Sequence, residues 1–260
     1  MVVKTLDELN YLEKLGLTRI SYSRLDTYEQ CPARYFYTYI AREPRVFGEY
    51  AVMGNIIHST LENVLEKEVP VDYPTLKKEF VNQGKEWDPD KQINDKLYEA
   101  GDVMLNEFFD RHEDEMMPID TKEASFNIVV GGALIRGYID RVDIEGDTVK
   151  VIDYKSGSRE VSFKKAPTNL QLGIYALAMS HKYPDKEIYA ELYYLRSGRR
   201  KGHLFSKDDL LEVEDKLIAL TKELITTENF SYTANKGICS FCDHRKNGSC
   251  SVGIRRYGRD

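Results

Sequence analysis

The chain has 260 residues, of which 42% are hydrophobic and 31% charged, and its formal net charge is −6 at pH 7. This composition is typical of a soluble globular protein with a sizeable core, and the acidic balance does not by itself indicate nucleic-acid binding. No apolar run approaches a membrane span and no secretory apolar stretch is seen, so we expect a cytoplasmic protein without a membrane partner.

The N-terminal half is predicted to be mainly helical. Ser23 and Asp26 resemble a capping-box helix start, with the helix ending at Gln30, and Pro32 suits the first turn of a second helix that continues to Ile40. Apolar residues at three- and four-residue spacing predict further helices over residues 55–66, 73–87 and 95–116. Residues 70–118 are therefore expected to form a helical insert.

The C-terminal half is predicted to alternate strands with helices. Runs of β-branched and aromatic residues predict strands over 123–130, 134–144, 148–154 and 187–195, and a short one over 202–205. Helices are expected over 168–181 and 208–227, and the second precedes a cysteine-rich segment. The whole chain, residues 1–260, is thus expected to be one α/β domain.

Three charged side chains are expected at the ends of two neighbouring strands. Asp140 lies in the first apolar run, and Asp153 and Lys155 end the second. Residues two apart in a strand share a face, so Asp153 and Lys155 point together and Tyr154 points away. Carboxylates are the ligands that hard cations such as Mg²⁺ and Mn²⁺ prefer. Taken alone, an Asp-x-Lys pair is usually a solvated ion pair on a half-exposed strand, and it is Asp140 on the preceding strand that favours a functional site.

This constellation resembles the core of the PD-(D/E)xK nucleases, and in particular their RecB-like branch. Similarity extends to His58 in an upstream helix and to Gln171 and Tyr175 in a downstream one. The resemblance implies a central mixed sheet flanked by helices, as in restriction endonucleases. It also implies a metal site for Mn²⁺ or Mg²⁺. The residues that it implies are the metal ligands His58, Asp140, Asp153 and the Tyr154 carbonyl, the catalytic set Lys155, Asp140 and Asp153, and the substrate-binding pair Gln171 and Tyr175.

Glu62 lies one helical turn after His58 and so shares its face. It is either a partner that orients the imidazole of His58 or a solvated helix charge, and the sequence favours neither role.

The four cysteines form a second constellation. Cys31 lies near one end of the chain, and Cys239, Cys242 and Cys250 lie near the other. This one-plus-three grouping resembles the iron–sulfur class of RecB-like nucleases, which includes AddB and the CRISPR-associated exonucleases. The resemblance implies a [4Fe–4S] cluster that joins the two terminal segments. Structural Zn²⁺, with His244 as a substitute ligand, is the alternative.

The resemblance implies a metal-dependent DNA exonuclease that prefers single strands and acts in recombination, repair or CRISPR spacer acquisition. Its expected protein partners are a helicase or CRISPR adaptation proteins. The alternatives are a phage recombination nuclease and a DNA-binding partner subunit of a helicase. Because the chain is acidic overall, its positive charge must be localised, and Arg196, in a predicted hairpin turn with Arg199, Arg200 and Lys201, is the best candidate for a DNA contact.

Overall fold

A computed structural model describes residues 20–44, 47–65, 71–112, 124–162, 165–233 and 235–259. The chain divides into two compact units. The first unit comprises Met1–Phe47, Phe126–Gly137 and Leu211–Asp260, and the second comprises Gly48–Ser125 and Tyr138–Leu210.

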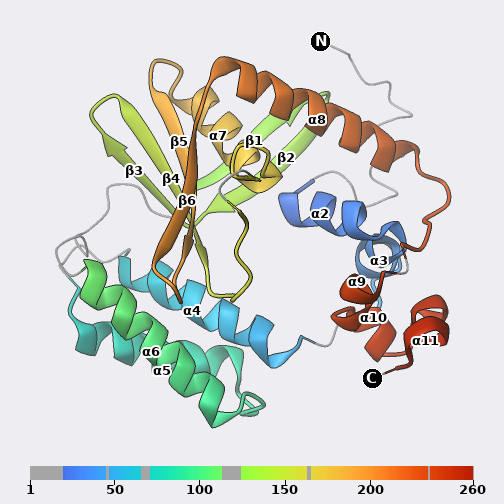
Figure 1. The fold of residues 1–260 in the computed structure, drawn as a ribbon, viewed down its shortest axis with the longest axis horizontal. Coiled ribbons are helices and arrows are strands. Elements are labelled where there is room, and N and C mark those ends of the chain that lie inside the picture. The colour runs from blue at the N-terminus through green and yellow to red at the C-terminus, as the bar shows by residue number, and fades with distance from the viewer. Residues whose placement is uncertain are drawn as a thin grey trace. The chain divides into compact units, whose positions relative to one another are not determined.

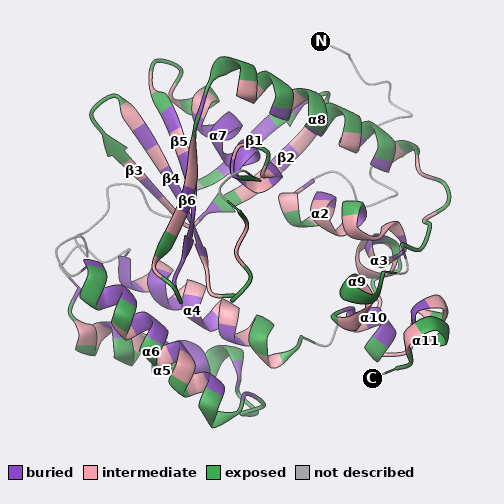
Figure 2. Ribbon diagram, viewed as in Figure 1, coloured by how far each residue is buried: buried purple, intermediate pink, exposed green. Residues whose placement is uncertain are grey.

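A four-stranded mixed sheet lies at the centre of the second unit (Figure 1). In spatial order its strands are β3 (Arg141–Glu145), β4 (Thr148–Lys155), β5 (Glu187–Tyr194) and β6 (Arg199–Phe205). The central strands β4 and β5 are parallel, and each edge strand pairs antiparallel with its neighbour. Most positions of β4 and β5 are buried (Figure 2), as expected of central strands covered on both faces. The predicted mixed sheet is confirmed, and β6 is longer than the expected strand over 202–205.

Helices cover both faces of this sheet. Helix α7 (Leu170–Lys182) connects β4 to β5 and packs on both strands. Helices α4 (Glu49–Leu65), α5 (Tyr73–Trp87) and α6 (Asp95–His112) share one apolar core with Ile152 and Tyr154 of β4. Because side chains alternate along a strand, Asp153 and Lys155 point to the other face, where α7 lies.

The helical predictions for the second unit agree closely with the structure. Helix α5 begins and ends where predicted, and α4 begins at Glu49 rather than Asn55, with the acidic Glu49 in its first turn. The predicted helix ends at Glu66 and over 113–116, and the predicted strand start at Glu123, lie outside the described residues. No helix in the described part of the chain is long and apolar enough to cross a membrane.

The prediction of a single strand over 134–144 is wrong, because the chain bends at Asp140 and forms two strands there. Strand β2 (Ala133–Ile139) pairs with β1 (Ala124–Val130) in a separate two-stranded sheet, and β3 starts only after the bend. The Asp140 carboxylate accepts the Tyr154 backbone N–H at 2.7 Å. A side chain thus takes the place of a backbone acceptor opposite β4, and the ladder of β3 begins one residue later, at Arg141.

The first unit contains the terminal helices. They are α2 (Tyr22–Gln30), α3 (Pro32–Tyr35), the π-helical turn η1 (Phe36–Ile40), α8 (Lys207–Thr226, which starts in the second unit), α9 (Lys236–Ser240), α10 (Asp243–Lys246) and α11 (Ser251–Tyr257). The predicted capping box at Ser23 is wrong, since Ser21 is the N-cap and its hydroxyl accepts from the Arg24 N–H at 3.4 Å. Tyr28 ties α2 to the end of α8, because its hydroxyl donates to Glu223 and lies 2.7 Å from the hydroxyl of Thr227.

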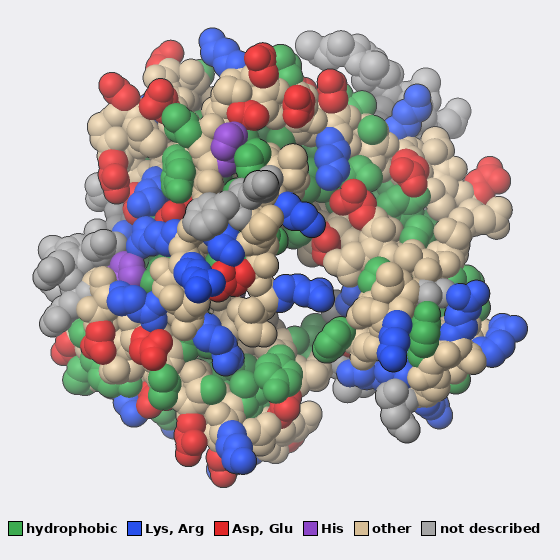
Figure 3. Space-filling model, viewed as in Figure 1, with side chains coloured by type: hydrophobic (Ala, Val, Ile, Leu, Met, Phe, Trp, Pro, Cys, Tyr) green, Lys and Arg blue, Asp and Glu red, His purple; other side chains and the backbone are tan. Residues whose placement is uncertain are grey.

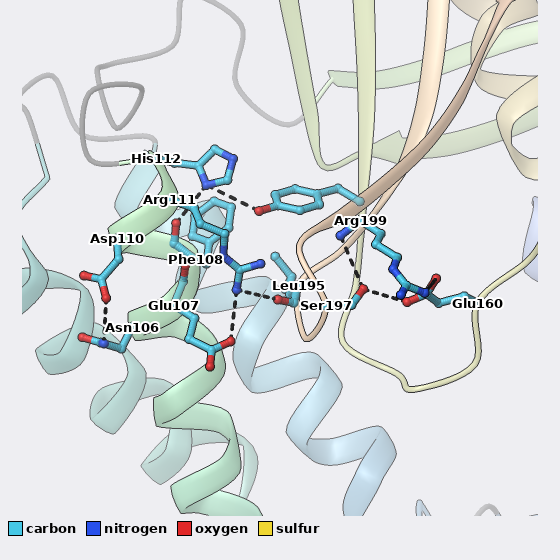
Figure 4. Close-up of polar contacts among 11 residues, drawn as sticks. Asn106, Glu107, Phe108, Asp110, Arg111, His112, Glu160, Leu195, Ser197 and Arg199 are labelled. Carbon is cyan, nitrogen blue, oxygen red and sulfur yellow. Dashed lines mark hydrogen bonds and ion pairs between the residues drawn. The ribbon is translucent and has the colours of Figure 1, made fainter. Parts of the chain in front are cut away.

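Polar contacts hold the β5–β6 hairpin turn of the second unit from two sides (Figure 4). From α6, an Arg111 N–H donates to the carbonyl of Leu195 at 3.3 Å. From the loop after β4, Glu160 accepts from the Ser197 hydroxyl at 2.7 Å. Gly198 has φ of 68°, a backbone conformation that residues with a Cβ rarely adopt, so the turn favours glycine. The predicted hairpin turn that contains Arg196 is therefore present and fixed in place.

We predict that Glu160→Gln destabilises the protein at neutral pH and that this difference disappears in acid. The hydrogen-bonded ion pair with Lys201 at 2.8 Å, together with the Ser197 hydroxyl, lowers the pKa of Glu160 from 4.5 to about 2. Because the folded-state pKa lies below the unfolded value, the contribution is complete above pH 4.5 and is lost as the pH falls through about 2. Urea unfolding between pH 2 and 7 measures it, with Glu86→Gln on exposed α5 surface as the matched control. A difference from wild type that does not change with pH contradicts the ion pair.

Candidate active site

His58 and Asp140 form the first half of the site. The apolar face of α4, which includes Ile57 and Leu61, is fully buried in the core, and His58 lies on the adjacent face. Its Nδ1 lies 3.3 Å from Asp140 Oδ2. Burial lowers the pKa of His58, but the hydrogen bond to Asp140 and the charge of Asp140 outweigh burial and raise it overall. Burial raises the pKa of Asp140, but the contacts with His58 and the Tyr154 N–H outweigh it and hold that pKa below its usual value.

Asp153 and Lys155 form the second half. Asp153 is only 3% exposed, and burial raises the pKa of its carboxyl while the ion pair with Lys155 opposes that change. A buried carboxylate requires close partners, and α7 supplies them. Gln171 donates from Nε2 to Asp153 Oδ1 at 2.7 Å and accepts at Oε1 from Lys155 Nζ at 2.8 Å. The Tyr175 hydroxyl donates to the same Asp153 oxygen at 3.4 Å.

Gln171 therefore acts as a clamp that fixes the carboxylate and the ammonium relative to each other. Its amide nitrogen binds the carboxylate and its amide oxygen binds the ammonium, since an amide carries both donors and an acceptor. Tyr175 shares this helix face and lies 3.0 Å from the donating nitrogen of Gln171. Burial and the neighbouring Asp153 charge raise the pKa of Tyr175, so its hydroxyl stays protonated.

Tyr154 contributes its backbone to the site and its ring to the core. The ring packs edge-on against Phe108 at 5.6 Å between centroids, on the face opposite Asp153 and Lys155. Its N–H is bound to Asp140, so the peptide that follows Asp153 is held in a fixed orientation. The structure thus places the ring of Tyr154 away from Asp153, as the strand alternation predicted.

A small cavity lies beside His58 and Asp140. It has a volume of about 30 Å³ and is lined by His58, Glu62, Asp140 and Tyr154. This is room for roughly one or two water molecules. The lining supplies an imidazole and two carboxylates, which suit a hard divalent cation by ligand type. Glu62 lines this cavity. The sequence did not decide between a role beside His58 and a solvated surface charge, and the one indication of the first role was the position of Glu62 one helical turn after His58.

The donors are not already gathered around one point. Across the described residues, no group of three or more His, Cys, Asp and Glu side chains is arranged to hold a metal ion. The reason at this site is that the carboxylates face nitrogen donors: Asp140 faces His58 and the Tyr154 N–H, and Asp153 faces Lys155 and Gln171. The side chains fit a cation in kind, and binding one requires some of these donors to be exchanged.

The predicted basic segment is largely neutralised by ion pairs. Lys and Arg side chains gather over β6 and its hairpin (Figure 3). Arg199 and Lys201 pair with Glu160, and Arg200 pairs with the buried Glu191. Arg196 is exposed in the hairpin turn and lies outside the Asp153–Gln171 network, but it lines a larger cavity with Ser156, Gly157 and Ser158, which follow Lys155.

The four cysteines gather in the first unit. Cys31, Cys239, Cys242 and Cys250 line one apolar cavity of about 20 Å³. Burial and the three other thiols raise the pKa of Cys239. All four are free, and Cys250 Sγ accepts the Gly253 N–H at 3.3 Å. The fold brings the N-terminal cysteine to the C-terminal three, and an iron–sulfur cluster there stays a prediction.

Comparisons with known proteins agree with this geometry. The model of the PD-(D/E)XK nuclease superfamily matches residues 19–247. Gene 69 protein of Mycobacterium phage L5 is 30% identical over 136 residues, which cover 50% of this chain and 44% of that protein. One component of the ATP-dependent helicase/deoxyribonuclease of Alkaliphilus metalliredigens is 27% identical over 204 residues, covering 58% of this chain and 17% of that component. The chain thus spans less than half the length of these curated relatives.

A solved structure supports the fold. A candidate exonuclease from Eubacterium rectale superposes with a TM-score of 0.56 at 12% sequence identity, and the match covers 94% of each chain. At this identity the likeness concerns the fold alone. The family model, in contrast, spans most of the sequence and includes every residue of the His58–Asp140–Asp153–Lys155 site. The chain therefore belongs to the PD-(D/E)XK nuclease superfamily.

Proposed function

We propose that the second unit is a divalent-cation-dependent deoxyribonuclease that acts on single-stranded DNA as an exonuclease, in recombination or repair. The observation that carries the proposal is the paired arrangement at the end of β4. On one side Asp140 contacts His58 and the Tyr154 N–H, and on the other Gln171 holds Asp153 against Lys155. A bound Mg²⁺ or Mn²⁺ would polarise a phosphate and lower the pKa of a coordinated water.

The protein groups have separate roles in this proposal. His58, Asp140, Asp153 and the Tyr154 carbonyl would hold the cation, and Glu62 is a further carboxylate at the same cavity. Lys155 carries a fixed positive charge that orients the attacking water and stabilises the charge that develops on the phosphate. Gln171 and Tyr175 direct the Asp153 carboxylate, because both donate hydrogen bonds to its Oδ1.

Exonuclease action and a preference for single strands are the finer parts of the proposal. The structural neighbour from Eubacterium rectale is described as a candidate exonuclease, and the similarity to a component of a helicase/deoxyribonuclease favours a strand already separated from its complement. That similarity also favours a second candidate, in which the chain works as the partner subunit of a helicase. Cleavage by the purified chain without any partner separates the two.

We further propose that Cys31, Cys239, Cys242 and Cys250 hold a [4Fe–4S] cluster. The four thiols line one apolar cavity, and cysteine thiolates are the usual ligands of such clusters. Zinc with His244 is the alternative. The Nε2 of His244 lies 2.8 Å from the Thr38 hydroxyl, and its ring packs on Tyr37, which favours a structural role for this histidine and an all-cysteine ligand set.

We predict that Lys155→Ala strongly slows DNA cleavage while the protein remains folded. The substitution removes the fixed charge and leaves Asp153 with Gln171 and Tyr175 as partners. Losing one such electrostatic group lowers the rate about 10²- to 10³-fold. The measurement is cleavage of end-labelled single-stranded and duplex DNA with Mg²⁺ or Mn²⁺, and Lys78→Ala, an exposed lysine of α5, is the control. Equal rates for Lys155→Ala and Lys78→Ala would rule out the catalytic assignment.

We predict that anaerobically purified protein contains iron and acid-labile sulfide in equal amounts. Cys242→Ser should lose both, because serine does not replace a buried thiolate ligand. Metal analysis and visible absorption of the same preparations provide the measurement. Stoichiometric zinc without sulfide would instead establish the zinc site, and His244→Ala then tests whether the histidine is a ligand.

A further inference from the structure

A second, larger cavity in the second unit is lined by residues that neighbour the candidate active site along the chain. Its volume is about 240 Å³. Two chain positions connect it to the catalytic groups, because Ile57 precedes His58 and Ser156 follows Lys155. Helix α4 lies close to the end of β4 here: a Cβ on Gly54 would lie 3.4 Å from the Ser156 hydroxyl. The cavity and the catalytic groups therefore share both a helix and a strand end.

The lining combines an apolar floor with a polar, aromatic rim. The floor consists of side chains that are at most 8% exposed, namely Met53, Ile57, Leu97 and Met104. The rim carries Ser156, Ser158, Arg196 and Tyr50, and Tyr50 is 73% exposed. An apolar floor with a few polar groups is typical of ligand sites, and this volume lies below the roughly 300 Å³ of the smallest drug-sized pockets. It suits one small planar group.

The cation at the rim is both available and held in place. Within the described residues no ion pair joins Arg196 to a carboxylate, whereas Arg199, Arg200 and Lys201 are all paired. The turn that carries Arg196 is fixed by Arg111 from α6 and by Glu160 from the loop after β4 (Figure 4). A positive charge is thus presented beside an apolar cavity and an exposed aromatic ring.

We propose that this cavity receives one unpaired nucleobase of the DNA strand, next to the phosphate that is cut. Tyr50 stacks on the base, the Met53 and Met104 side chains adapt to any of the four bases, and Arg196 contacts an adjoining phosphate. This subsite rests on the proposed nuclease function and explains a preference for single strands, since a base in a duplex is not free to enter. A sequence-tolerant stacking site also suits an enzyme that degrades a strand stepwise.

Binding measurements test the subsite without requiring cleavage. In a Lys155→Ala background, single-stranded oligonucleotides carry the fluorescent base 2-aminopurine at successive positions, and quenching reports stacking. We expect quenching that depends on Tyr50 at one position. Tyr50→Ala should remove it and weaken binding about tenfold, whereas Tyr50→Phe, which keeps the ring, should preserve both. Equal quenching in Tyr50→Ala and in the parent, or no binding of DNA at all, overturns the proposal.

Two further measurements separate this proposal from the nuclease assignment. With Lys155 intact, a substrate that lacks one base should be cut slowly only when the missing base adjoins the scissile phosphate, and equal cleavage wherever it lies overturns the subsite alone. Absence of cleavage of every substrate overturns the proposed function, and the quenching experiment then still decides whether the cavity binds a base.

Arg196→Ala should reduce the slope of log K for DNA binding against log salt concentration by about 0.7, and Arg196→Lys should restore the slope. A slope unchanged in Arg196→Ala rules out the phosphate contact.

Discussion

The hydrogen bond from the Tyr154 N–H to the Asp140 carboxylate is the contact on which the rest of the site depends. It joins two residues fourteen positions apart at 2.7 Å, ends one strand and delays the next. By doing so it places a carboxylate beside His58 and fixes the peptide that joins Asp153 to Tyr154. Structural and chemical roles are thus combined in one side chain, which is why a bend replaces regular strand at this point.

The site also concentrates the electrostatic cost of burying charge. Asp153 is nearly inaccessible, and an isolated carboxylate there would be strongly destabilising. Lys155, Gln171 and Tyr175 compensate for its burial. Each of them contacts the Asp153 carboxylate directly, within the candidate active site. The pKa values of Asp140 and Asp153 shift in opposite directions. Hydrogen bonds outweigh burial at Asp140 and lower its pKa, whereas burial dominates at Asp153 and raises its pKa. Such pairs of unlike carboxyls are typical of functional sites.

Much of this arrangement is predictable from sequence, and the exceptions share a cause. Strand periodicity was sufficient to place Asp153 and Lys155 on one face, and apolar spacing located both ends of α5. The bend at Asp140 depends on a side chain that replaces a backbone acceptor across two strands, which periodicity does not register. Likewise Arg199 to Lys201 read as a free basic patch, but distant acidic residues, Glu160 and Glu191, neutralise them. Local patterns indicate elements and faces, whereas partners that are far apart in sequence decide which charges remain available.

The most direct test of the central role of Asp140 is the Asp140→Asn variant, with cleavage and folding measured on the same preparation. An asparagine oxygen still accepts the Tyr154 N–H, so the bend and the thermal stability should be nearly unchanged. Only the negative charge that faces His58 and the cation cavity is lost. We expect a folded protein that no longer binds Mn²⁺ at this site and no longer cleaves DNA. A variant that cuts DNA at the wild-type rate would contradict the claim that Asp140 is a metal-binding carboxylate.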